Sequence, residues 1–70
     1  MTAPATWPQP DGTPVACREK LRVLEENHAE LAQVMRDAFE DAVLMGVAPE
    51  AMRRMLAEMV ADLCSPTARA

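Results

Sequence analysis

Apolar residues recur at spacings of three and four along most of this chain, and Gly46 and Pro49 interrupt the pattern once. Such spacings place side chains on one face of a helix. A glycine readily adopts the left-handed conformation that ends a helix, and a proline is favoured at the first helical position. The sequence therefore predicts an all-α antiparallel helical hairpin, with a long helix at about 14–45 and a short helix at about 49–64.

Proline residues mark the outer ends of this hairpin. Thr13 is expected to cap the long helix, with Pro14 at its first position. Residues 1–13 contain three further prolines and are expected to form an extended arm. Pro66 ends the short helix, because the residue before a proline is displaced from helical geometry. Residues 65–70 are then a frayed tail.

The two predicted helices differ in length, and this difference predicts association. At about 1.5 Å per residue, the short helix covers only the C-terminal half of the long one. The apolar face nevertheless continues to Leu21, near the start of the long helix. Two rows form this face: Leu21, His28, Met35 and Ala42 in one, and Leu24, Leu31, Ala38 and Met45 in the next. A second copy of the chain is the expected cover, which gives a dimer in the form of a four-helix bundle.

The predicted interface, for this dimer or for another protein, combines the uncovered start of the long helix with the methionine-rich short helix. It consists of Leu21, Leu24, His28, Leu31, Met35, Met52, Met55 and Met59. His28 has two interpretations: a polar residue that fixes the register of a buried seam, or a partly wet ring at its edge. The methionines are either ordinary core residues or a flexible binding surface.

Trp7 is the only tryptophan and stands in the arm, directly before Pro8. Two interpretations remain open for it. The ring folds back as an anchor that covers apolar surface near the start of the long helix, or the arm presents it to another protein as a short linear motif. Only the first makes the arm part of the folded unit.

Charge and composition narrow the choice of partners. The net charge is −4, which disfavours nucleic acid and anionic membrane surfaces. No apolar run approaches the length of about 20 residues that spans a membrane, and the first residues lack the features of a secretory signal. We therefore expect a cytoplasmic protein whose two cysteines are reduced.

Few residues offer chemistry of their own. Cys17, Cys64 and His28 are the only soft metal ligands, so an ordinary four-ligand zinc site is absent from one chain. The hairpin brings Cys64 within about one turn of His28 but provides no third group and no room for a substrate cavity. It places Cys17 about 20 Å from Cys64, too far for a disulfide. The sequence predicts no catalytic residues, no metal and no cofactor.

The function expected from these features is that of a noncatalytic, small acidic interaction protein, an adaptor or regulator that self-associates and binds another protein. Two alternatives stand beside it. One is an RNA- or DNA-associated helical-hairpin dimer, supported only by the basic cluster of Arg18, Lys20 and Arg22. The other is a precursor peptide that enzymes modify in its tail, at Cys64 and the residues after it.

Overall fold

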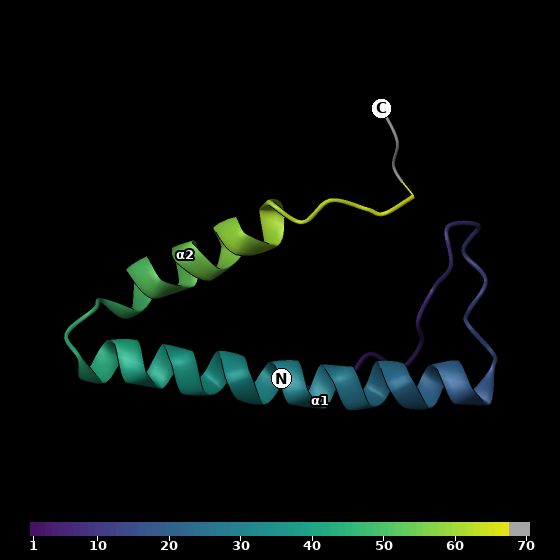
Figure 1. Ribbon diagram of the computed structural model, residues 1–70, viewed down its shortest axis with the longest axis horizontal. Coiled ribbons are helices and arrows are strands. Elements are labelled where there is room, and N and C mark those ends of the chain that lie inside the picture. The colour runs from purple at the N-terminus through teal and green to yellow at the C-terminus, as the bar shows by residue number, and fades with distance from the viewer. Residues whose placement is uncertain (68–70) are drawn as a thin grey trace. The chain divides into compact units, whose positions relative to one another are not determined.

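The computed structural model describes residues 1–67 and contains two helices, α1 (Arg18–Leu44) and α2 (Pro49–Ala61), after an N-terminal arm (Figure 1). In these residues the only β structure is one isolated bridge. The predicted all-α helical hairpin is confirmed. The chain divides into two compact units, Met1–Arg36 and Asp37–Ala70, and each is described by itself.

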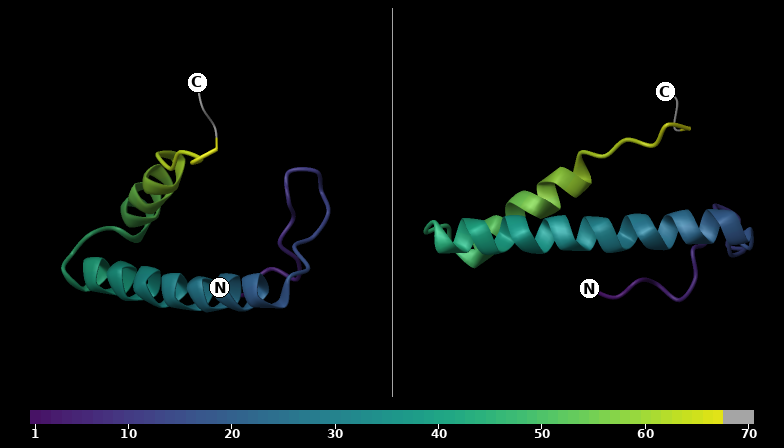
Figure 2. Two further views of the ribbon diagram at one scale, coloured as in Figure 1. Left: turned by 45° about the vertical axis from the view of Figure 1, so that its right-hand side comes forward. Right: turned by 60° about the horizontal axis from the view of Figure 1, so that its bottom comes forward.

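The arm of the first unit forms a tight turn instead of a fully extended strand (Figure 2). The backbone N–H groups of Val15 and Gln9 donate to the carbonyl oxygens of Trp7 and Thr13, both at 2.8 Å. Gly12 has a φ of +91°, a conformation that glycine adopts without the strain of a side chain. The arm is therefore held closed by its own backbone.

Thr13 and Pro14 belong to this turn, so the predicted start of the long helix is wrong. The backbone N–H and the hydroxyl of Thr13 both donate to Oδ1 of Asp11, at 3.0 and 2.7 Å. Pro14 pairs with Pro8 in an antiparallel bridge. The fixed φ of proline fits extended backbone as well as a first helical turn, and the residue before it prefers extended geometry. Helix α1 consequently begins at Arg18.

Cys17 occupies the position that Thr13 was expected to hold. Its carbonyl accepts the backbone N–H of Leu21 at 2.9 Å, the first hydrogen bond of the helix. The backbone N–H of Lys20 lies at the sulfur and lowers the pKa of the Cys17 thiol, because it stabilises the thiolate.

The connection between the helices follows the predicted stop and restart. Gly46 has a φ of +105°, and its N–H donates to the carbonyl of Val43 at 3.0 Å. The N–H of Val47 donates to the carbonyl of Ala42 at 2.9 Å. These two bonds form a Schellman motif, which satisfies carbonyl groups that the end of a helix leaves free. Helix α1 ends at Leu44, one residue earlier than expected.

Helix α2 begins at Pro49 as predicted, after an extended Ala48 that provides no side-chain cap. It ends at Ala61 instead of Cys64. Pro66 has no N–H to donate, and the residue before it is displaced from helical geometry. The carbonyl groups of a last turn that reached Cys64 would therefore have no N–H donors. The end of the predicted tail, residues 68–70, lies outside the described part of the chain.

The second unit packs α2 against the end of α1. The guanidinium carbon of Arg53 lies 5.0 Å from the centre of the Phe39 ring, a cation–π contact of about 0.5–1 kcal/mol at an exposed site. Ala42 is buried, and Met52 and Leu56 of α2 are half-buried. This small contact is the helical hairpin, and its core contains no large side chain that is fully buried.

Candidate interaction surfaces

The first unit contains an inner face of α1 that the chain itself covers. Its five residues follow spacings of three and four, and each is buried or half-buried: Leu21, Leu24, His28, Ala32 and Met35. Ala32 is the only one that is fully buried, at 5% exposed. All of these residues except Ala32 belong to the interface that the sequence predicts.

The arm provides part of that cover through Trp7. The Trp7 and His28 rings meet edge to face, with their centres 6.2 Å apart and their planes at 77°. Aromatic pairs of this geometry contribute about 0.5–1.5 kcal/mol. Within residues 1–67, however, no acceptor pairs with the buried Nε1 of Trp7, which costs about 1–3 kcal/mol. The arm is therefore a weakly held cover.

A second apolar row of α1 faces solvent, and we call it the outer seam. It consists of Val23, Asn27, Leu31 and Val34, and all four are exposed. Leu31 and Val34 are 60% and 63% exposed. At about 100° per residue, this row lies roughly a quarter of a turn from the inner face. Its spacings of four, four and three are those of a seam that pairs with one other helix.

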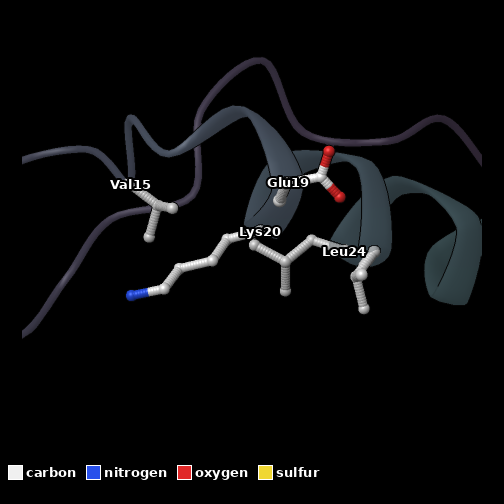
Figure 3. Close-up of a pocket in the computed structure, with 5 residues that line it drawn as sticks. Val15, Glu19, Lys20 and Leu24 are labelled. Carbon is white, nitrogen blue, oxygen red and sulfur yellow. The ribbon is translucent and has the colours of Figure 1, made fainter.

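A shallow apolar groove lies at the N-terminal end of the outer seam (Figure 3). It has a volume of about 390 Å³ and is lined by Val15, Glu19, Lys20, Val23 and Leu24. In Figure 3 the side chains of Val15, Lys20 and Leu24 point to one side of the helix, while the carboxylate of Glu19 points away. The groove extends the apolar surface of the seam toward the arm.

The basic cluster near the start of α1 is partly neutralised. Nη2 of Arg22 lies 2.9 Å from Oε2 of Glu19, and Nη1 lies 3.3 Å from Oε1 of Glu26. Both pairs are exposed, so each contributes little stability. They nevertheless reduce the positive potential that Arg18, Lys20 and Arg22 present to a phosphate backbone.

The second unit presents another apolar surface, on one side of the hairpin. Arg53 and Phe39 mark the opposite side by their contact. Counted at about 100° per residue, Ala38 on α1 and Met45 just after it, and Met55 and Met59 on α2, are displaced from the packed residues in the direction away from Arg53. Antiparallel helices bring equal displacements to the same side. We call these residues the methionine surface: Ala38, Met45, Met55 and Met59. Met45, Met55 and Met59 are 79%, 56% and 66% exposed.

Carboxylates border the methionine surface. Asp41 on α1, and Glu58 and Asp62 on α2, lie beside it in the helical rotation, and none of the three forms an ion pair within residues 1–67. Residues 37–70 contain six acidic and three basic side chains, a net charge of −3. Residues 1–36 contain five and four, a net charge of −1. The acidity of the chain is thus concentrated in the second unit.

The other side of the hairpin carries a shallow groove of about 420 Å³. Phe39 and Arg53 form part of its wall, and the remaining lining residues are Glu40, Val43, Leu44 and Pro49. Its acidic side chain, Glu40, and its basic side chain, Arg53, balance in charge, and the cation–π contact lies in its wall.

The structure separates the predicted interface residues into two classes. Leu31, Met55 and Met59 are exposed, whereas Leu21, Leu24, His28, Met35 and Met52 are half-buried. The interface predicted from the sequence did not include Val23, Asn27 or Val34. The signal was present as a second row at spacings of three and four, but one helix can hold two such rows and the sequence does not say which one the chain covers.

The predicted neighbours His28 and Cys64 belong to different units. The thiol of Cys64 donates to the carbonyl of Asp62 at 3.7 Å, and both cysteines are exposed free thiols. Among residues 1–67, no three His, Cys, Asp or Glu side chains converge where a metal ion would be held.

Comparisons with protein families, with curated proteins and with solved structures found no match for this chain. Neither helix in the described residues has the length and apolar character needed to cross a membrane. The assignment of function consequently rests on the two exposed surfaces.

Proposed function

We propose that this chain is a noncatalytic interaction protein, an adaptor or regulator, that associates with itself and binds another protein. The observation that carries this proposal is the exposure of large apolar side chains on both helices, while Ala32 and Ala42 alone are buried among residues 1–67. A fully buried aliphatic side chain contributes about 1.5–3 kcal/mol. A chain of this size that leaves its large residues in water gains most of its stability from association.

The outer seam supports self-association. It is narrow, so it suits pairing with a single helix, and α1 of a second copy carries the same row. Asn27 lies in the middle of the seam, and a polar asparagine at one such position fixes register and oligomeric state. The near balance of charge in residues 1–36 adds little repulsion between copies. A dimer, and the four-helix bundle expected from the sequence, remain predictions with the outer seam as their contact.

Sedimentation equilibrium of the full chain tests this proposal. We expect a mass twice the 7.7 kDa of one chain, with dissociation on dilution. A monomer at every concentration would contradict self-association. On sequence grounds we place the protein in the cytoplasm, where its cysteines stay reduced.

A precursor peptide is the second candidate, because the structure removes one argument against it. Cys64 was expected inside the last helical turn, but α2 ends at Ala61. Cys64, Ser65 and Thr67 are exposed and non-helical, as the substrates of a modifying enzyme must be. The intact mass of protein from its native host distinguishes this function: an added mass on the tail supports it, and an unmodified chain contradicts it.

The nucleic-acid alternative has less support. Its basic cluster contains Arg22, which already pairs with two glutamates, and the net charge of the chain is −4. Binding through phosphate contacts falls steeply with salt, so a titration with a short RNA at two salt concentrations detects it. Absence of binding at low salt would exclude this alternative.

A further inference from the structure

We infer that the methionine surface takes a basic amphipathic helix of another protein, and not a second copy of this chain. This inference rests on the proposed function, because it names the partner of one of the two exposed surfaces. The acidic border selects the occupant by charge: a helix with an apolar stripe and with lysine or arginine on either side of it.

The shape and chemistry of the surface favour a helix as the occupant. Met55 and Met59 are one turn apart on α2, and Ala38 and Met45 are exposed on the α1 part of the same unit. Exposed apolar side chains spaced one helical turn apart suit an amphipathic helix that presents its own apolar residues at i, i+3, i+4 and i+7. Methionine side chains are flexible and polarisable, so they adapt to the apolar stripe of a partner. Ala38 is small and permits close approach.

The charge of the border excludes a second copy. Asp41 lies on the α1 edge, and Glu58 and Asp62 lie on the α2 edge. A two-fold dimer through this surface brings carboxylates of one copy against carboxylates of the other, whichever helices meet. Like charges placed opposite each other across an interface cost several kcal/mol. A basic helix turns the same three carboxylates into attractive partners and accelerates encounter.

The outer seam differs in this respect and serves as the internal comparison. Its unit has five acidic and four basic residues, a net charge of −1 against −3 for the second unit, so repulsion between copies is weaker there. The two surfaces therefore accept different occupants, one from a second copy and one from another protein. They can be tested separately because no residue belongs to both.

The test uses the full chain and three labelled peptides of about five helical turns, or about 18 residues. All three carry the same leucine stripe, and the remaining positions are lysine, glutamine or glutamate. Fluorescence anisotropy gives each dissociation constant. We expect the lysine peptide to bind at least tenfold more tightly than the glutamate peptide, with the glutamine peptide between them, and the difference to shrink as salt increases.

Two variants locate the site. The double substitution Met55→Gln and Met59→Gln removes two apolar contacts without changing charge, and we expect it to weaken binding of the lysine peptide at least tenfold. Leu44→Gln is the matched control: Leu44 is 85% exposed in the same unit but lies off the methionine surface, so binding should not change. Circular dichroism verifies that both variants remain helical.

Four outcomes overturn the inference, and one of them also overturns the proposed function. Equal binding of the three peptides, or equal effects of the two variants, shows that the methionine surface does not select a basic helix. If the methionine substitutions abolish the dimer, a second copy occupies this surface, and the proposed function stands without the inference. If the chain stays monomeric and binds no peptide of any charge, both fail.

Discussion

In the first unit the N-terminal arm packs against α1, whereas in the second unit helix α2 packs against the end of α1. In the first unit, Trp7 of the arm reaches His28 across 6.2 Å, and the inner face becomes half-buried. In the second unit, α2 sets Arg53 over Phe39 at 5.0 Å. Both arrangements cover one face and leave another in water. The difference lies in what is left exposed. The first unit, whose charges nearly balance, exposes the narrow outer seam, and the second unit exposes the methionine surface with its acidic border.

Under the proposed function, this difference assigns a different kind of association to each unit. Charge balance permits a surface to meet its own copy, and an unbalanced border of one sign prevents it. The width of the apolar surface also differs: a single row suits pairing with one helix, and apolar residues on two neighbouring helices suit a third helix. Each of the following changes affects one unit and leaves the other as its control.

The largest effect is expected from a charge placed in the outer seam. Leu31→Glu removes about 1.5–3 kcal/mol of burial from each copy, so the dimer loses at least about 3 kcal/mol, roughly a hundredfold in its dissociation constant. Sedimentation equilibrium measures this loss. Ala29→Glu is the control, because it adds the same charge on the opposite side of α1. Equal dissociation by the two variants would show that charge alone, and not the seam, controls association.

An intermediate effect is expected at the two glycines with positive φ. A Cβ atom on Gly46 or Gly12 meets nothing within 4 Å, so alanine there introduces backbone strain only, of about 1–2 kcal/mol. Gly46→Ala should lower the thermal stability of the helices, measured by circular dichroism. Gly12→Ala should release the arm and shift the emission of Trp7 to longer wavelength. A larger loss of helix thermal stability in Gly12→Ala than in Gly46→Ala would contradict the assignment of the two glycines to separate units.

A smaller effect is expected from Trp7→Phe. The change removes the buried Nε1 that has no acceptor in residues 1–67, which offsets the loss of ring area, so docking of the arm should change by less than about 1 kcal/mol. Trp7→Ala removes the aromatic contact as well. The chemical shifts of the His28 ring protons report docking in both variants. If Trp7→Phe releases the arm as completely as Trp7→Ala does, the unpaired donor does not weaken the arm.

The smallest effect is a change in reactivity at the start of α1. The N–H of Lys20 lowers the pKa of the Cys17 thiol, and the thiolate is the reactive form. In a Cys64→Ser variant, alkylation of Cys17 should therefore accelerate at a lower pH in the folded chain than in urea. By linkage, the lowered pKa stabilises the helix start above the thiol's ordinary pKa, and this contribution disappears as pH falls through the native value. If the rate of alkylation depends on pH in the same way in the folded chain and in urea, the N–H of Lys20 does not stabilise the Cys17 thiolate, and α1 does not begin after Cys17.

The centre of the fold could be predicted from the sequence because its signals act locally. Gly46 is one of the two residues with positive φ, and Pro49 begins α2 as expected. A glycine that closes a Schellman motif and a proline at the first helical position each depend on their own backbone conformation. No distant contact was needed to identify them.

The start of α1 could not be predicted because its signals are ambiguous. Thr13 before Pro14 is typical of a helix start, yet the same two residues also fit an extended turn. The deciding contact is that of Asp11, whose Oδ1 accepts both hydrogen bonds from Thr13. The end of α2 differed for a similar reason, since Pro66 shortened the helix by a turn more than expected.

The division between covered and exposed rows lay beyond sequence reasoning. Spacings of three and four describe both the inner face and the outer seam of α1, which lie about a quarter of a turn apart. Which row is covered depends on where the arm packs. The sequence offered His28 as a polar residue in an association seam or as a ring at the edge of that seam. In the structure its ring meets that of Trp7, and Asn27 lies in the outer seam.

The most direct test of the central claim, that the two units accept different occupants, is methyl NMR on the full chain labelled at methionine, leucine and valine. On serial dilution, we predict that the methyl signals of Val23, Leu31 and Val34 shift, while those of Met45, Met55 and Met59 stay in place. Addition of the lysine peptide should produce the reverse pattern. Methionine signals that move on dilution, with seam signals that do not, would contradict the account.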